Sequence, residues 1–118
     1  MRALEAWRDA IIAAQRAVGC QGGCPIGALS AELSDRDLQA HARLAAAYGA
    51  WEDGLHVGLQ VMQDRGELTA DADPAYFALA LLTAVQGGLI MDQARRDKVS
   101  LETVLNAMIE RVRCLATA

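Results

Sequence analysis

The sequence predicts an all-α fold of about five helices, and three observations indicate this class. Helix-forming residues dominate the chain, and runs of β-branched residues are absent. Both prolines, Pro25 and Pro74, stand where a helix could begin. Apolar residues recur at intervals of three and four in the first and last segments. The chain has 118 residues without an internal repeat or linker, which predicts a single domain over residues 1–118.

The first helix is predicted over residues 3–17. It begins almost at Met1 without a capping residue, so we expect the chain to be part of a longer protein. A glycine-rich loop follows at residues 19–24, and Pro25 begins a short helix that ends near Ser34. The apolar stripe of the first helix consists of Leu4, Trp7, Ile11, Ala14 and Val18.

The longest helix is predicted to begin after its N-cap, Asp35, and to end at Arg65, with Gly66 as the stop signal. On a helical wheel its two faces differ in polarity, so one should face solvent and the other the core. The predicted solvent face carries Arg36, Gln39, Arg43 and Asp53. The predicted inward face carries His41, Ala45, Tyr48, Glu52, Leu55 and Leu59.

The helix predicted near residues 74–95 carries no charge from Pro74 to Met91. Asp73 is its predicted N-cap. A surface helix has one apolar stripe, whereas a helix that is apolar all round must be covered on every side. A chain this short covers one side, so we expect a second copy of the chain to cover the rest. A membrane span is not expected, because glycines, a threonine and a glutamine interrupt the segment and acidic residues flank it.

The last helix is predicted to begin after Ser100 as its N-cap. Its apolar residues form a broad face that a core or a partner helix could cover. This face consists of Leu101, Val104, Leu105, Met108, Ile109, Val112 and Leu115.

Charge and cysteine content narrow the classes of function. The net charge of −4 argues against a nucleic-acid interface in this chain, because such interfaces are usually basic. The three cysteines are an odd number, and the N-terminus lacks the apolar core of a signal peptide. Both features predict a cytoplasmic protein with free thiols.

Three segments in order resemble the C-terminal regulatory domain of tetracycline-repressor (TetR) family transcription factors. They are GCPIGALSAEL, a long helix with WEDGL and VMQDRGEL, and DADPAYFALALLTAVQGGLIM. The most specific pieces are GCPIG, the RGEL–DADP turn and LLTAVQGGL. The resemblance rests on their order and spacing and covers nearly the whole chain.

The resemblance implies a homodimeric, all-helical domain that binds a small apolar or amphipathic molecule. In this family the last two helices of each subunit form a four-helix bundle at the dimer interface. An N-terminal helix-turn-helix domain binds a DNA operator, usually as a repressor, and the ligand releases the DNA. No segment of this chain corresponds to that DNA-binding domain, so operator binding is expected only of the parent protein.

Two adjacent glycines, Gly87 and Gly88, lie in the middle of the uncharged helix, where each costs about 1 kcal/mol relative to alanine. Such glycines are tolerated where two helix backbones approach closely. That approach could occur within one subunit or between two subunits, and we favour the second. The predicted interface consists of Phe77, Leu81, Ala84, Gly87, Gly88, Met91, Val104, Met108, Ile109 and Val112.

Glu52 falls on the predicted inward face of the longest helix, where a carboxylate is costly unless it is paired. It could be a polar anchor in an apolar ligand cavity, or it could lie at the rim and pair with an arginine, which we favour. A pocket of this kind is mostly apolar with a few placed polar groups. The predicted pocket residues are Trp7, Ile11, His41, Tyr48, Trp51, Glu52, Leu55, His56 and Met62.

An alternative function on the same fold is a thiol-based sensor of oxidants or electrophiles. Cys24 precedes Pro25 at the predicted N-cap of the short helix, and helix N-termini favour the reactive thiolate. Cys20 would be the resolving partner. The simpler interpretation, which we favour, is that Cys24 is a small apolar residue at a tight turn.

No metal site, cofactor or enzymatic activity is predicted. Cys20, Cys24, His41 and His56 could supply four ligands, but their spacing matches no common zinc pattern. The chain has no glycine-rich phosphate loop or nucleophile elbow, and neither histidine has an evident nucleophile beside it. The leading hypothesis is a ligand-sensing dimerisation domain, and a helical dimer without a cavity is a further alternative.

Overall fold

The computed structural model describes residues 1–17 and 38–117. Within these ranges all regular structure is helical, which confirms the all-α class, whereas the predicted loop and short helix at residues 19–34 lie outside the described residues. The other predicted helix ends hold to within a few residues, whereas the predicted N-cap of the longest helix, Asp35, lies outside the described residues. The helices are α1 (Arg2–Ala17), α3 (Leu38–Asp64), α4 (Pro74–Arg95) and α5 (Val99–Arg113).

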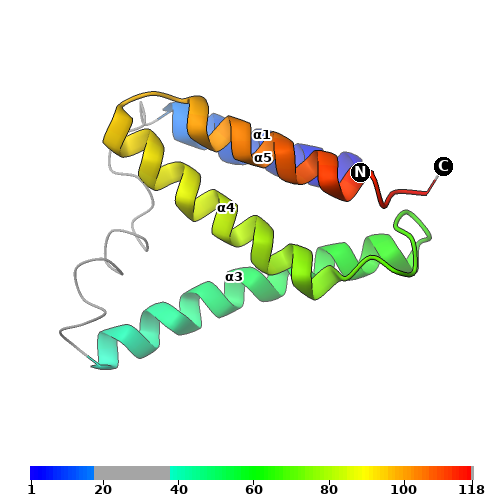
Figure 1. Ribbon diagram of the computed structural model, residues 1–118. Helices are drawn as coiled ribbons and strands as arrows, with labels where there is room; N and C mark the ends of the chain where they lie inside the picture. Colours follow the sequence, from blue (N-terminus) through cyan, green and yellow to red (C-terminus); the bar gives the residue numbers. More distant parts are fainter. Residues whose placement is uncertain (18–37, 118) are drawn as a thin grey trace.

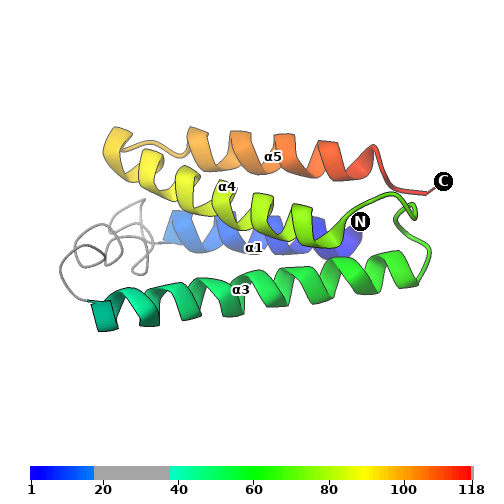
Figure 2. The ribbon, with the colours of Figure 1, turned by 60° about the horizontal axis from the view of Figure 1, so that its bottom comes forward.

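The helices α3, α4 and α5 follow one another as antiparallel neighbours (Figure 1). The central helix of this layer is α4, which packs against both α3 and α5. The helix α1 lies behind α4, between α3 and α5, as Figure 2 shows. One face of α4 is therefore covered by other helices, while the opposite face is left outward.

The core consists of two adjacent clusters of buried side chains. Trp7 of α1 and Met108 of α5 pack against both clusters and so connect them. The first cluster contains Leu4, Leu59, Met62, Leu68, Ala72, Phe77, Ala78, Leu81, Ile109 and Val112. The second contains Ala84, Val85, Leu89, Leu101 and Leu105.

The ends of α3 and α4 follow the capping signals in the sequence. The Asp73 carboxylate accepts hydrogen bonds from the backbone N–H groups of Ala75 (3.1 Å) and Tyr76 (3.3 Å), so the predicted N-cap of α4 is confirmed. Gly66 takes a left-handed conformation, with φ of 77°. Its N–H donates to the Gln63 carbonyl, and the next N–H donates to the Met62 carbonyl. This pair of bonds is a Schellman motif, and it confirms Gly66 as the stop of α3.

The turn from residue 65 to residue 73 is fixed from two sides. The Gln63 side chain donates hydrogen bonds to the carbonyls of Thr69 (3.0 Å) and Ala72 (2.8 Å). The C-terminal segment pairs with the same turn, because the Thr69 N–H donates to Leu115 and the Thr117 N–H donates to Glu67. The end of the chain therefore closes the loop between α3 and α4.

Replacing Gln63 with alanine should lower the free energy of unfolding by about 1 kcal/mol, because two carbonyls of the turn lose their donor. Urea denaturation at fixed protein concentration measures the change. The control is Gln93→Ala, at an exposed position of α4, which should change stability by less than about 0.5 kcal/mol. Equal stability of the two variants would contradict the role given to Gln63.

The predicted N-cap of α5, Ser100, is wrong. The helix begins at Val99, so Ser100 lies in its first turn. The oxygen acceptor comes instead from the end of α4, where Asp92 Oδ1 accepts from the N–H groups of Ser100 (2.9 Å) and Leu101 (3.3 Å). Asp92 is fully buried, and a second carboxylate, Asp97, accepts from the Val99 N–H. A negative charge at this helix end also interacts favourably with the helix dipole.

The predicted inward faces of α1 and α3 are also wrong at a few positions. On α1, Ala14 is exposed and the neighbouring Gln15 is buried, because the stripe turns by one residue toward the end of the helix. On α3, His41 and Ala45 are exposed, and the buried residues, Leu59 and Met62, lie near its C-terminal end. The inward face of α3 is thus confined to the part that packs on α1 and α4.

Polar contacts connect α1 to α5 along their length. Arg16 pairs with Glu102 at 3.0 Å, and Arg8 donates to the Asn106 side chain at 3.3 Å. Near the other end Arg113 pairs with Glu5 at 2.6 Å. These groups are largely exposed, so each pair adds little stability and mainly sets the register of the two antiparallel helices.

By length and composition alone, α4 could cross a membrane. Its central place in the layer, with ten buried residues packed into the core, accounts for the same composition. Core helices of globular proteins share this property. Packing into the core therefore accounts for the apolar residues on the buried half of α4, without a membrane.

Candidate functional site

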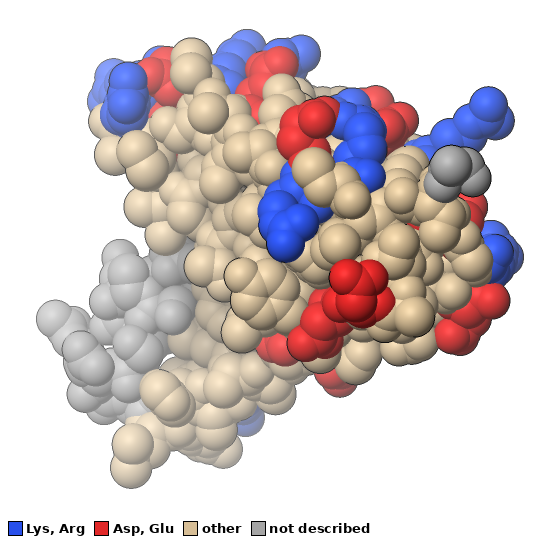
Figure 3. All heavy atoms as spheres, turned by 45° about the vertical axis from the view of Figure 1, so that its right-hand side comes forward, with Lys and Arg blue, Asp and Glu red and all other residues tan. Residues whose placement is uncertain are grey.

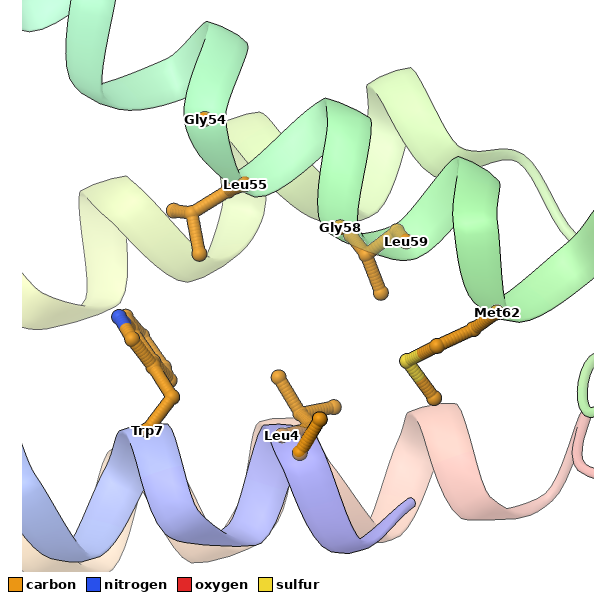
Figure 4. Close-up of a pocket in the computed structure, with 8 residues that line it drawn as sticks. Leu4, Trp7, Gly54, Leu55, Gly58, Leu59 and Met62 are labelled. Carbon is orange, nitrogen blue, oxygen red and sulfur yellow. The ribbon is translucent and has the colours of Figure 1, made fainter.

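An apolar pocket of about 170 Å³ lies between α1 and the C-terminal half of α3. Figure 4 shows its side chains projecting from the two helices toward the space between them. Trp7 stands on α1 opposite Leu55 on α3, and Met62 closes the far end. The lining consists of Ala3, Leu4, Trp7, Gly54, Leu55, Gly58, Leu59 and Met62.

The pocket has a buried floor and an open mouth. Leu4, Leu59 and Met62 are each at least nine-tenths buried and form the floor. Gly54 and Gly58 are exposed and form the mouth. None of the lining side chains is charged, and the indole N–H of Trp7 is the one hydrogen-bonding group that they contribute. The lining of the pocket is therefore almost entirely apolar.

The two glycines at the mouth have no packing reason within the described part of the subunit. A Cβ atom built on Gly54 or Gly58 would meet nothing within 4 Å. Each glycine in a helix costs about 1 kcal/mol relative to alanine, so together they weaken α3 by about 2 kcal/mol. What they provide is open space at the pocket mouth.

The structure divides the predicted pocket residues into three groups. Trp7, Leu55 and Met62 line the pocket. Ile11 and Trp51 pack instead against the second core cluster. The remaining four lie outside the lining: His41 is exposed, while Tyr48, Glu52 and His56 are half-buried. No ion pair connects Glu52 to another described residue, so the favoured salt bridge of Glu52 is not found within the described ranges.

Sequence reasoning missed the two glycines of the pocket and the buried Gln15. The signal for the glycines was present, because Gly54 and Gly58 are one turn apart in a helix that, apart from them and Gly49, is rich in helix formers. The Gln15 side chain is 5% exposed, and its Nε2 has no hydrogen-bond partner among the described residues. A wheel drawn with the stripe on Ala14 could not place it inside.

A second apolar depression, of about 520 Å³, lies on the outward side of α4 and α5, and we call it the outward groove. Thr83, Gly87 and Met91 follow one another at one-turn intervals along α4, and Val104 and Met108 face them from α5. The full lining is Ala80, Thr83, Ala84, Gly87, Gly88, Met91, Ser100, Val104 and Met108.

The predicted interface residues fall into two sets. Six of them line the outward groove: Ala84, Gly87, Gly88, Met91, Val104 and Met108. The other four must be corrected, because the subunit itself buries them in the first core cluster: Phe77, Leu81, Ile109 and Val112. An interface through α4 and α5 would use their outward sides, not these core positions.

The favoured explanation of Gly88 is also corrected. A Cβ atom on Gly88 would lie 2.7 Å from the Cα of Leu101, so the close approach is between α4 and α5 of one subunit. Gly87 has nothing within 4 Å of such an atom and faces outward. The two neighbouring glycines therefore have different structural roles.

The outward half of α4 exposes large apolar side chains that the interface prediction did not include. Tyr76, Leu79 and Ile90 are 66%, 53% and 52% exposed. On the face shown in Figure 3, charged side chains lie along the top, in the centre, toward the lower edge and on the right, whereas the area on the left between the upper charges and the grey residues is uncharged. The uncharged run from Pro74 to Met91 could have identified these positions, because it leaves no polar side on the helix.

The thiol-sensor alternative stays a prediction, because Cys20 and Cys24 lie outside the described residues. Cys114 is a free thiol and is exposed just after α5, so it is not a core residue. Within residues 1–17 and 38–117, no group of three or more His, Cys, Asp or Glu side chains is placed to hold a metal ion.

The family model described as "Tetracyclin repressor-like, C-terminal domain" matches residues 1–108. The matched part includes both walls of the pocket and all the residues that line the outward groove. No curated protein and no solved structure matches the chain.

Proposed function

Because the chain belongs to the tetracyclin repressor-like C-terminal domain family, we propose that it is the ligand-sensing and dimerising domain of a transcriptional repressor. Operator binding then resides in an N-terminal DNA-binding part of the parent protein. The working compartment is the cytoplasm, and the domain uses no cofactor and catalyses no reaction.

The uncharged outward half of α4 carries the proposal of a homodimer. Leu79, Ile90 and Met91 are about half exposed, and the outward groove continues the apolar surface onto α5. Large exposed apolar patches are typical of protein interfaces. In a two-fold dimer the same surface of each subunit faces its copy, so α4 and α5 of two subunits would form a four-helix bundle.

The pocket between α1 and α3 supports ligand sensing. It is concave, apolar and lies on helices other than those that line the outward groove. Trp7 lines the pocket and Met108 lines the groove, and both side chains pack against the same two core clusters. A ligand that favours one packing of these clusters would shift the population of dimer arrangements, and with it the affinity of the parent protein for DNA.

Met91→Glu should weaken the dimer by at least about tenfold in dissociation constant, because it places a charge in the apolar groove. Light scattering and sedimentation across a concentration series measure the effect. The matched control is Val57→Glu, which places the same charge at an exposed apolar position of α3 outside the groove. This control should remain as dimeric as the unchanged protein.

A well-folded monomer at all concentrations in the unchanged protein would overturn the proposed dimer. A dimer that Val57→Glu disrupts and Met91→Glu does not would place the interface elsewhere. Circular dichroism of both variants verifies that a change in mass does not arise from unfolding.

A further inference from the structure

We propose that the pocket between α1 and α3 takes an uncharged molecule with a single aromatic ring, bound with its apolar end inward and any polar substituent at the mouth. This inference rests on the proposed ligand-sensing function and names the class of ligand. It follows from the volume of the pocket, the chemistry of its lining and the position of its two glycines.

The volume sets the size. A dry cavity of about 150 Å³ lined by aliphatic and aromatic side chains holds one benzene molecule. The present pocket, at about 170 Å³, is of the same size and is lined by the same kinds of side chain. A single ring with a small substituent fits within it, whereas a multi-ring ligand would have to extend through the mouth into solvent.

The lining sets the charge and the orientation. No lining side chain is ionisable, so a charged group at the floor would be desolvated without a partner. At the mouth, Ala3, Gly54 and Gly58 are exposed, and a hydroxyl or amide there keeps its contact with water. The floor of Leu4, Leu59 and Met62 covers the apolar end.

The glycines indicate a flat ligand. Gly54 and Gly58 leave the α3 backbone bare on the side where Trp7 projects from the opposite helix. A ring can therefore lie against a backbone surface on one side and meet the Trp7 indole on the other. Offset or edge contacts between aromatic rings favour this arrangement over an aliphatic chain of equal size.

The test is isothermal titration of the full chain with three probes. They are 4-methylphenol, a neutral single ring; 4-methylbenzoate, its anionic counterpart; and cyclohexanol, a neutral ring without aromatic faces. We expect 4-methylphenol to bind at least about tenfold more tightly than 4-methylbenzoate and measurably more tightly than cyclohexanol.

Two variants assign the binding to this pocket. Gly58→Leu fills the mouth and should weaken 4-methylphenol binding by at least about tenfold. Gly49→Leu makes the same substitution in the same helix, at a glycine that also has nothing within 4 Å and does not line the pocket. It should leave affinity within about twofold. Both substitutions replace a helical glycine with a good helix former, so neither should unfold the protein.

The outcomes separate the ligand class from the function itself. Tighter binding of 4-methylbenzoate, still lost in Gly58→Leu, would overturn the neutral class and leave the pocket as the sensing site. Equal loss of 4-methylphenol affinity in both variants would overturn the placement in this pocket. If none of the probes bound while the protein remained a dimer in solution, the aromatic-ring inference would be overturned. The proposed dimerisation would still stand.

Discussion

Gly88→Leu should lower the free energy of unfolding by about 3 kcal/mol, the upper end of the usual cost of overpacking a core. Even the first added atom would lie 2.7 Å from the Cα of Leu101 and 2.9 Å from its Cδ1. The nearest of these contacts is to backbone, so no rotamer change relieves it, and α4 and α5 must move apart. The gain from replacing a helical glycine, about 1 kcal/mol, does not offset this cost.

Urea denaturation of Gly88→Leu and Gly49→Leu at one protein concentration tests this expectation. The control adds the same side chain to a helix where it meets nothing, so its stability should rise by up to about 1 kcal/mol. A Gly88→Leu protein as stable as the control would mean that α4 and α5 do not approach as closely as described.

Asp92→Ala should lower the free energy of unfolding by about 3 kcal/mol. The carboxylate is fully buried and accepts from two N–H groups at the start of α5, those of Ser100 and Leu101. Its removal leaves both donors without an acceptor and opens a small cavity between α4 and α5. Loss of a side-chain acceptor at a helix start alone costs about 1 kcal/mol, and the burial of this carboxylate adds the rest.

Two further variants separate capping from bulk. Asp92→Asn keeps an oxygen acceptor of the same shape and should recover at least half of the loss. Asp97→Ala removes the neighbouring cap of the Val99 N–H at a less buried position and should cost about 1 kcal/mol. If Asp97→Ala were the more damaging of the two alanine variants, the central capping role assigned to Asp92 would be wrong.

The different roles of the adjacent glycines Gly87 and Gly88 could not be predicted from the sequence. Helix boundaries near Asp73 and Gly66 could be predicted because capping is local chemistry. The two glycines look alike in sequence, and only the position of Leu101 in space separates the buried one from the outward one. The same reason explains the wrong cap at Ser100, because its replacement, Asp92, belongs to the preceding helix.

The apolar chemistry of the candidate site could be predicted from the sequence, but only some of the residues that line it could be. An apolar pocket with Trp7, Leu55 and Met62 follows from the stripes of the two helices. His41 and Tyr48 failed to reach it, because the wheel of a long helix gives direction and not how far along the helix a neighbour extends, whereas His56 lies within the right stretch but on another side of the helix. His41 lies near the start of α3, whereas the pocket uses positions from Gly54 onward.

The polar contacts between α1 and α5 have a consequence for the order in which the molecule assembles. The sequence separations of these contacts, 86 residues for Arg16 with Glu102 and 108 for Glu5 with Arg113, are far larger than those across the α4–α5 turn. Closing such long loops is entropically costly, so local hairpins form before distant contacts repay that cost. We therefore expect α1 to dock late in folding and to detach early in unfolding. Since α1 forms one wall of the pocket, we expect the pocket to exist only in the last-formed state of the chain, and a molecule bound there would stabilise that state against the one with α1 detached.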